Sequence, residues 1–193
     1  MSFEQATFTG GRVAFYETTF SGADVSFYGV FFSHRRVSFS GATFSGGEVS
    51  FEAAKFAEGS VSFNRATFSG GEISFDKATF LGGEVTFEYA TFSGTRMTFQ
   101  NAKAPGIPIR DPRSHDGNTM SEPSSHTVIS FRGSTFSRGR IDFDGTTFGG
   151  DMLTIDGQKY SGNLITFDDT TFSGGEVTKD GRPFPGWPPP DVW

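Results

Sequence analysis

A phenylalanine recurs at every twelfth position along the first half of this chain, and a second phenylalanine follows each of the first at the fifth position after it. The first series is Phe3, Phe15, Phe27, Phe39, Phe51, Phe63, Phe75, Phe87 and Phe99. The second series is Phe8, Phe20, Phe32, Phe44, Phe56, Phe68, Phe80 and Phe92. Self-similarity at a fixed period is typical of repeat architectures, in which no single repeat can bury its apolar side alone. The chain is therefore predicted to stack many near-identical units.

Each repeat contains two short segments that alternate in the manner of a β-strand. An aliphatic residue such as Val61 precedes the first Phe by two positions, and Ala66 stands in the same relation to the second. This period of two places the outer pair on one side and the central Ser or Thr on the other. The burial of eight residues tests this expectation. The side chains expected in the core are Phe63, Phe68, Phe75 and Phe80, and those expected on the surface are Ser62, Thr67, Ser74 and Thr79.

The residues between these segments have turn chemistry, and no segment shows helical periodicity. Gly pairs such as Gly46-Gly47 and Gly70-Gly71 supply backbone angles with positive φ at low cost. Strands this short become stable when each coil pairs with the next at about 4.8 Å, which stacks the Phe rings into ladders. The pattern predicts an all-β solenoid with a narrow, Phe-filled core.

The composition narrows the functional classes. The 193 residues include 25 Phe and 26 Gly but no Cys, so disulfides and thiolate metal sites are excluded. The net charge of -6 argues against direct binding to nucleic acid and against attraction to anionic membranes. No basic-then-apolar leader and no apolar run of about 20 residues is present, so a soluble, cytoplasmic protein is expected.

The repeat resembles the pentapeptide-repeat family. Val61-Ser62-Phe63 and Ala66-Thr67-Phe68 match that family's inward Phe and the small or aliphatic residue two positions earlier. The resemblance covers roughly residues 3–102 and 129–178, and it implies a right-handed, four-sided β-helix. The chain departs from the family in one respect, because the spacing of its Phe residues alternates between 5 and 7. The two additional residues are Gly-rich and are interpreted as a bulged corner.

Two coil lengths are compatible with the repeat. A flat, two-sided coil would contain one repeat, and a four-sided coil would contain two. The tetrapeptide Thr-Phe-Ser-Gly is intact at 19–22, 43–46, 67–70 and 91–94, which is every second repeat, whereas the intervening repeats deviate. The longer coil of two repeats is favoured.

The domain organisation is read from breaks in the period. Residues 1–102 form a first solenoid block, 103–127 an inserted loop, 128–180 a second block and 181–193 a Pro/Trp-rich C-terminal cap of one continuous domain. The core pairs expected in the second block are Phe131/Phe136, Phe143/Phe148, Ile155/Tyr160 and Phe167/Phe172. Lys179 then falls in a core slot and ends the solenoid, and Phe184, Trp187 or Trp193 is expected to plug its last layer.

The chain offers little to a catalytic interpretation. Ser114-His115-Asp116 has the residue types of a hydrolytic triad, but adjacent residues cannot point at one another in the required order. Four residues of the inserted loop are acceptable metal ligands, but they do not have the spacing of a known metal site: Asp111, His115, Asp116 and His126. We expect no catalytic, cofactor or metal site, and the chain is predicted not to be an enzyme.

Acidic residues mark the second block. An Asp follows the core slot in four successive repeats, and two further Asp residues lie beside this set, which predicts an acidic stripe. The candidate partner-binding residues of the stripe are Asp142, Asp144, Asp156, Asp168, Asp169 and Asp180. The candidates in the inserted loop are Arg110, Asp111, Arg113 and His115. A weaker acidic column, Asp24, Glu48 and Glu72, recurs at every second repeat of the first block.

Three functions remain open from the sequence. The first is a non-enzymatic interaction or scaffold protein with an unknown protein partner. The second is implied by the resemblance: a mimic of duplex DNA that binds DNA gyrase or another type II topoisomerase and protects it from inhibitors. The third is binding to ice or another surface through a ladder of Thr19, Thr43, Thr67 and Thr91. A homodimer through an end coil is also compatible, because the repeat begins at Phe3 without a cover.

Overall fold

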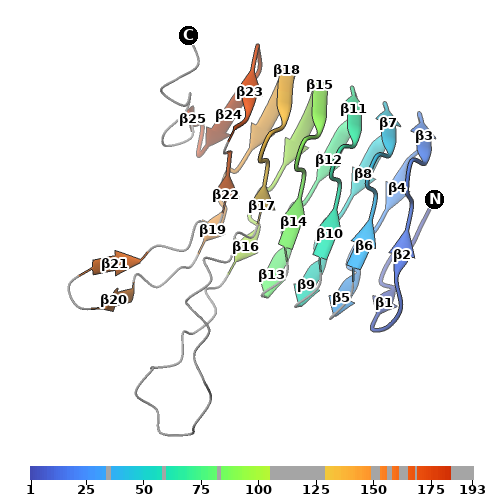
Figure 1. Cartoon of the computed structure of the whole chain (residues 1–193). Coiled ribbons are helices and arrows are strands. Elements are labelled where there is room, and N and C mark those ends of the chain that lie inside the picture. The colour runs from blue at the N-terminus through green and yellow to red at the C-terminus, as the bar shows by residue number, and fades with distance from the viewer. Residues whose placement is uncertain are drawn as a thin grey trace, which may run out of the picture.

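The computed structural model describes residues 1–33, 36–57, 60–81, 84–104, 129–148, 153–155, 158–160, 165–167 and 169–183. These residues form short strands and turns without a helix, and the strands stack in parallel along one axis (Figure 1). The structure is a β-solenoid with four faces per coil. The all-β solenoid predicted from the sequence is thereby confirmed.

Two faces of the solenoid are separate six-stranded parallel sheets. The first face contains β1 (Thr7–Phe8), β5 (Phe31–Ser33), β9 (Lys55–Ala57), β13 (Thr79–Leu81), β16 (Lys103–Ala104) and β19 (Thr147–Phe148). The second face contains β2 (Val13–Ala14), β6 (Arg36–Ser38), β10 (Ser60–Ser62), β14 (Glu84–Thr86), β17 (Ile129–Ser130) and β22 (Ile165–Thr166).

The other two faces are joined into one sheet by two long strands, β15 (Thr91–Thr98) and β18 (Thr135–Asp142), each of which bends from the third face to the fourth. The third face also contains β3 (Thr19–Ser21), β7 (Thr43–Ser45), β11 (Thr67–Ser69) and β23 (Thr171–Phe172). The fourth also contains β4 (Val25–Ser26), β8 (Glu48–Ser50), β12 (Glu72–Ser74) and β24 (Glu176–Lys179). At its edge β25 (Arg182–Pro183) pairs antiparallel with β24.

Each coil of the first block contains two repeats, as favoured from the sequence. Val61 pairs with Val85, and the ring of Phe63 lies 5.0 Å from that of Phe87 with an interplanar angle of 5°. In both pairs the partners are two repeats apart, so a four-sided coil is confirmed and a flat coil of one repeat is excluded.

The burial of the test residues follows the strand alternation with one exception. The rings of Phe63, Phe68, Phe75 and Phe80 are all at most 1% exposed, as predicted. Ser62, Thr67 and Thr79 are partly or fully exposed, but Ser74 is buried although its strand alternation points it outward. The Ser74 hydroxyl is satisfied at this position, because it accepts a hydrogen bond from the Asp76 N–H at 3.2 Å.

The second block differs from the sequence-based prediction. Phe131 stacks directly on Phe167 at 5.0 Å, which leaves no room in the coil for the repeat that contains Ile155 and Tyr160. These two residues instead belong to an antiparallel hairpin of β20 (Leu153–Ile155) and β21 (Gln158–Tyr160), drawn apart from the stacked strands in Figure 1. The prediction that Ile155/Tyr160 form a core pair is therefore wrong. An apolar pair at the right spacing suits a hairpin as well as a coil.

Hydroxyl groups replace Ala in the small core slots of the second block. Ser134 donates to the Phe87 carbonyl at 2.5 Å, Thr146 to the Phe99 carbonyl at 2.8 Å and Thr170 to the Phe131 carbonyl at 2.9 Å. Each hydroxyl thus bonds to the preceding coil, which removes the penalty of burying an unsatisfied polar group.

The turns use the left-handed backbone region more widely than the Gly pattern indicated. In the turn Phe51–Ala54, the Ala54 N–H donates to the Phe51 carbonyl at 3.1 Å, and Ala53 has φ 57°. Equivalent positions in other coils hold Arg65, Lys77 and Tyr89, also at positive φ. This geometry corresponds to a type II turn, whose third residue requires positive φ.

The Gly pairs at the corner between the third and fourth faces confirm the positive φ expected of them, but their two members differ. A Cβ at Gly71 would lie 2.4 Å from the Gly47 carbonyl oxygen of the preceding coil, whereas a Cβ at Gly70 would meet nothing within 4 Å. Both residues have nearly the same φ, 77° at Gly70 and 75° at Gly71.

Substitution at these neighbours separates backbone strain from steric overlap. Gly70→Ala should lower the free energy of unfolding by about 1–2 kcal/mol, because it only forces Ala into the left-handed region. Gly71→Ala should lower it by roughly a further 1–3 kcal/mol, since the coils must move apart locally. Urea denaturation followed by circular dichroism measures both. Equal losses in the two variants would contradict the close approach.

Candidate functional site: the acidic face

The fourth face of the solenoid carries the largest ordered array of acidic side chains among the described residues. On its outer surface, equivalent residues of successive coils form three columns. One contains the residue at the start of each strand, the middle one contains mostly Ser and Thr, and the last contains a residue of the turn that follows the strand. The first column is Asp24, Glu48, Glu72, Arg96, Arg140 and Glu176, in strand register from one coil to the next. The turn column is Glu4, Tyr28, Glu52, Asp76, Gln100, Asp144 and Asp180. We call this surface the acidic face.

The N-terminal half of the acidic face contains six carboxylates, and four of them make no ion pair with any residue that the structure describes. Those four are Glu4, Asp24, Glu48 and Asp76. Glu52 is paired with Lys77 at 2.7 Å, and Glu72 with Arg96 at 3.6 Å. Both ion pairs are largely solvated, so they neutralise charge without adding much stability.

Backbone groups fix two of the unpaired carboxylates. Asp24 Oδ1 accepts a hydrogen bond from the Glu48 N–H at 3.0 Å, and Asp76 Oδ1 accepts one from the Gln100 N–H at 2.8 Å. Each carboxylate therefore reaches one coil along the axis, and its second oxygen makes no bond to the described residues. Since coils repeat at strand spacing, negative charges are presented about 4.8 Å apart along the axis.

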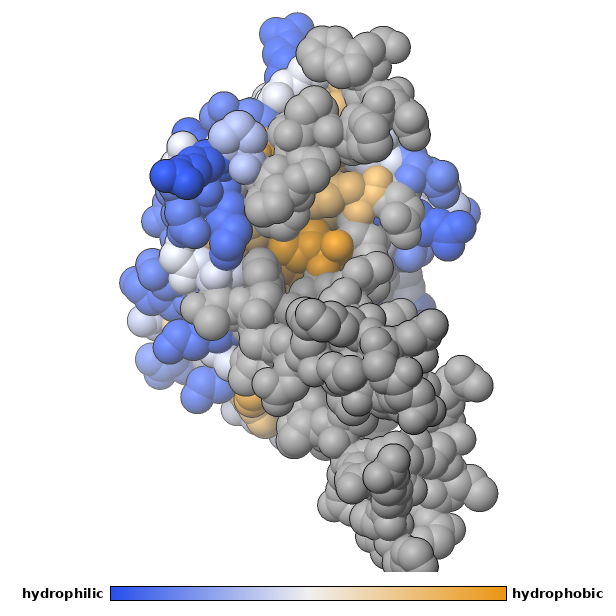
Figure 2. Space-filling view, turned by 90° about the vertical axis from the view of Figure 1, so that its left-hand side faces the viewer, coloured by the Kyte–Doolittle hydropathy of each residue, from blue (hydrophilic) through white to orange (hydrophobic). Residues whose placement is uncertain are grey.

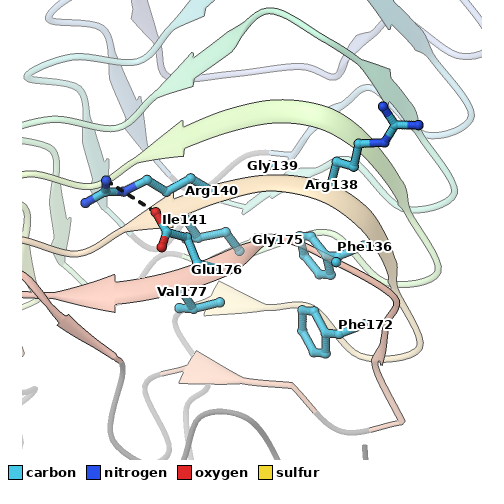
Figure 3. A pocket seen from close by; sticks show the side chains of 10 residues that line it. Phe136, Arg138, Gly139, Arg140, Ile141, Phe172, Gly175, Glu176 and Val177 are labelled. Atoms are coloured by element: carbon cyan, nitrogen blue, oxygen red, sulfur yellow. Dashed lines mark ion pairs between the residues drawn. The ribbon is translucent and has the colours of Figure 1, made fainter.

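The C-terminal half of the same face has its carboxylates engaged internally. Asp142 is 3% exposed, accepts a hydrogen bond from the Asp144 N–H at 2.9 Å and lies 3.6 Å from Arg140. Arg140 also pairs with Glu176 at 3.3 Å, an ion pair drawn in Figure 3. Asp142 thus closes a turn, as Ser26, Ser50 and Ser74 do in the first coils, and it is not available to a partner.

Asp144 and Asp180 exchange hydrogen bonds with each other's turns. Asp144 Oδ1 accepts from the Gly181 N–H at 3.0 Å, and Asp180 Oδ1 accepts from the Gly145 N–H at 2.8 Å. The bond from Gly181 lowers the pKa of the Asp144 carboxyl below its ordinary value of 3.8. These two residues therefore join the last two coils.

The structure describes four of the acidic residues predicted for the second block, and they do not all share one surface: Asp142, Asp144 and Asp180 lie on the acidic face, whereas Asp169 does not. A coil of two repeats places successive repeats at opposite corners, so Asp144 and Asp169 lie on different sides of the solenoid. Asp169 is exposed and faces Arg132 at 3.7 Å, on the corner between the second and third faces. The other predicted residues, Asp156, Asp168, Arg110, Asp111, Arg113 and His115, lie outside the described residues.

Sequence reasoning missed the turn column of the N-terminal half. Glu4, Glu52 and Asp76 occupy the same turn position in different coils, and the signal was present at every second repeat counted from Glu4. It was hidden by Tyr28, which occupies the second coil's place in the column. The column Asp24, Glu48 and Glu72, found from the sequence as a weaker feature, forms the other side of the acidic face.

The one cavity that the described residues are seen to line is small. The cavity between β18 and the last coil, which Phe136, Ile141, Phe172 and Val177 line, has a volume of about 10 Å³ (Figure 3). That space is sufficient for at most one water molecule. No group of three or more His, Cys, Asp or Glu residues in the described ranges could hold a metal ion, and none of the described elements is a helix able to cross a membrane.

Comparison with known proteins places the fold. Residues 58–103 match the family model described as pentapeptide repeats (9 copies). No curated protein matches the chain.

Two solved structures of repeat proteins align with most of the chain. One is a trypsin-treated variant of QnrB1, described as a plasmid-mediated fluoroquinolone resistance protein, with 14% identity, coverage of 89% of this chain and 91% of that one, and a TM-score of 0.19. The other is HetL, a pentapeptide repeat protein involved in heterocyst differentiation regulation from the cyanobacterium Nostoc, with 12% identity, coverage of 94% and 93%, and a TM-score of 0.14. At these scores neither likeness bears on function.

The Asp144 contact predicts a specific response to acid. Its pKa is lowered on folding, so Asp144 contributes stability that is fully present above pH 3.8 and is lost as the pH falls through the lower folded-state pKa. Asp144→Asn should reduce the free energy of unfolding at neutral pH and flatten its decline in acid. Thermal unfolding midpoints measured between neutral pH and strong acid test this. An unchanged acid slope in the variant would show that the carboxylate is not linked to folding.

Proposed function

We propose that this chain is a non-enzymatic interaction protein whose acidic face binds a basic surface of a protein partner. The observation that supports the proposal is the pair of carboxylate columns in the N-terminal half, with Glu4, Asp24, Glu48 and Asp76 free of ion pairs among the described residues. Regularly spaced like charges on a rigid surface create a field that steers and orients an oppositely charged partner.

The rigidity of the scaffold favours binding over catalysis. Carboxylates held by the backbone of a stacked coil lose little conformational freedom when they meet a partner, which reduces the entropic cost of association. A linear array of fixed charges suits an extended basic groove.

DNA gyrase is the specific partner to test first. The resemblance to the pentapeptide-repeat family implies a type II topoisomerase as one partner class, and a groove that accepts the phosphates of duplex DNA is basic and extended. Under this hypothesis the acidic face occupies the DNA groove of the enzyme. The proposal of an acidic interaction surface does not depend on gyrase being that partner.

Charge reversal with a matched control tests both the acidic face as a binding surface and gyrase as its partner. The double variant Asp24→Lys/Glu48→Lys should lose salt-sensitive binding to gyrase, together with any inhibition of supercoiling or relief of quinolone inhibition. The control Glu17→Lys/Glu84→Lys makes the same change of net charge at exposed positions away from the acidic face and should behave as the unsubstituted chain. Binding is measured by fluorescence anisotropy over a series of salt concentrations.

The outcomes distinguish the hypothesis about gyrase from the hypothesis about the acidic face. If gyrase is not bound at low salt, the topoisomerase hypothesis is wrong, and the variants are compared on immobilised protein with cell lysate and mass spectrometry. Proteins retained by the control and eluted by salt, but not retained by Asp24→Lys/Glu48→Lys, would support the acidic face. Identical sets of retained proteins from both variants would contradict it.

The third face supports a second candidate function, binding to ice. Its outer surface carries a column of Thr flanked by a column of Ser. The Thr column contains no charged side chain, whereas Arg138 is the register partner of Ser93 in the flanking column, at a β-bulge. The Thr column is Thr19, Thr43, Thr67, Thr91, Thr135 and Thr171. Most of these residues are exposed, and their hydroxyls form no hydrogen bond with the described residues. A flat array of unbonded hydroxyls can order water.

Ice binding has a direct assay. The chain should slow ice recrystallisation and separate the freezing and melting points, and Thr67→Lys/Thr91→Lys should abolish both effects by interrupting the array. Thr79→Lys, on the first face, is the control and should leave them intact. Absence of both effects in the unsubstituted chain would exclude this candidate.

A further inference from the structure

Two Asp-Gly dipeptides occupy equivalent turns of the last two coils that the structure describes, on the acidic face. They are Asp144-Gly145 and Asp180-Gly181. In such a dipeptide the backbone nitrogen of Gly can attack the side-chain carboxyl group of the preceding Asp, because Gly has no side chain to hinder the approach. A bond forms between this nitrogen and Cγ, the proton of the nitrogen and the carboxyl hydroxyl leave as water, and a cyclic succinimide results. Water then opens the ring at the main-chain carbonyl, and the product is isoaspartate.

Neither turn is protected from this reaction by burial. Asp180 and the two glycines are exposed, and Asp144 is partly buried. Figure 2 looks onto this end of the solenoid and shows polar side chains along part of its rim and apolar ones nearer the middle. The backbone also favours Gly after each Asp, since Gly145 has φ 63° and Gly181 has φ 69°, both in the left-handed region. The sequence thus places a reactive dipeptide in each turn, where water has access.

Each dipeptide binds the reacting nitrogen of the other. The Gly145 N–H donates to Asp180 Oδ1 at 2.8 Å, and the Gly181 N–H donates to Asp144 Oδ1 at 3.0 Å. The nitrogen attacks after it loses its proton, and a carboxylate that accepts a hydrogen bond from that N–H opposes the loss, because a second negative charge would form beside it. The same two bonds engage each carboxyl group with the neighbouring coil instead of the nitrogen of its own dipeptide.

The peptide group between Asp144 and Gly145 is held from both sides. Its oxygen, the Asp144 carbonyl, accepts a hydrogen bond from the Asn101 N–H of the preceding coil at 2.9 Å, and its N–H bonds to Asp180 of the following coil. Rotation of this peptide group toward the side chain would break both bonds. The contact with the Gly181 N–H also lowers the pKa of the Asp144 carboxyl group, so this group stays ionised and lacks the hydroxyl that must leave as water.

We propose that Asp144-Gly145 and Asp180-Gly181 are a latent pair of isoaspartate sites that protect each other from isomerisation. Conversion of either Asp displaces its carboxylate from the Gly nitrogen of the other dipeptide, which then becomes reactive. Isoaspartate also adds one carbon atom to the main chain, and the one-to-one register between coils cannot absorb it. The first conversion therefore promotes the second, and the two together loosen the contact between these coils. The inference is independent of the function proposed for the acidic face.

Peptide mapping with electron-transfer fragmentation measures the reaction, because it distinguishes isoaspartate from aspartate and locates it in the sequence. At neutral pH both dipeptides of the folded chain should form isoaspartate at least about tenfold more slowly than in the chain unfolded in guanidinium chloride, since a hydrogen bond to a charged group must first break. Asp180→Ala frees the Gly145 nitrogen, so the rate at Asp144 should rise several-fold toward that of the unfolded chain. Asp144→Ala should have the reciprocal effect at Asp180.

Glu176→Gln is the matched control for the alanine variants. It removes the ion pair between Arg140 and Glu176, which joins the same two coils at 3.3 Å, and it leaves both Asp-Gly contacts in place. Its rate at Asp144 should equal that of the unsubstituted chain, and circular dichroism checks that each variant is folded. The proposal is wrong if folded Asp180→Ala shows no rise at Asp144. It is also wrong if Glu176→Gln shows the same rise, because general loosening of the coil would then explain the effect.

The unsubstituted chain gives a second test that needs no variant. Cleavage on the carboxyl side of arginine leaves both dipeptides on one peptide, because no Arg lies between Arg140 and Arg182. Chains with isoaspartate at one site should carry it at the other more often than independent conversion predicts. Statistically independent conversion of the two sites would overturn the proposal even if no variant folds.

Discussion

The stacking of equivalent residues at the spacing of one coil is the constraint on which the rest of the structure depends. Phe rings stack on the rings of the next coil at centroid distances between 4.4 and 5.4 Å, and the described interior has almost no other large side chain. Because each hydrogen bond between coils joins equivalent backbone positions, one residue more or fewer within a coil would displace every column. Insertions are compatible with this register only where the chain leaves the stack and returns to the same point.

The same repetition arranges the surface into columns, and the chemistry of a column changes along its length. In the N-terminal half of the acidic face, Asp24 and Asp76 are each held by one backbone contact and remain solvated. In the C-terminal half Asp142 is buried beneath its turn, and Asp144 and Asp180 bond to each other's backbone. Identical side-chain types on one face therefore serve recognition in one part, under the function proposed above, and cohesion in the other.

The sequence was sufficient to predict the fold because the period of the Phe series is itself the structural rule. It was less informative where an apolar pair could satisfy two geometries, as at Ile155 and Tyr160, which form a hairpin outside the coil. For the site it was informative only in part: Asp144 and Asp180 share the turn column, but Asp169 lies at another corner, since successive repeats of one coil lie at opposite corners. Left-handed turn residues such as Ala53 and Lys77 were not predictable from composition, since the stack imposes a conformation that neither residue prefers.

Both long interruptions of the solenoid leave from one corner, between the first and second faces. The chain departs after β16 and returns at β17, and one coil later it departs after β19 and returns at β22. Since β16 pairs with β19 and β17 with β22, the two points of departure are neighbours, and so are the two points of return. Two appendages are thus anchored side by side on a rigid base, and the length of either can change during evolution without disturbing the register of the stack. This corner is the place where the repeat protein can acquire new structure without loss of the old.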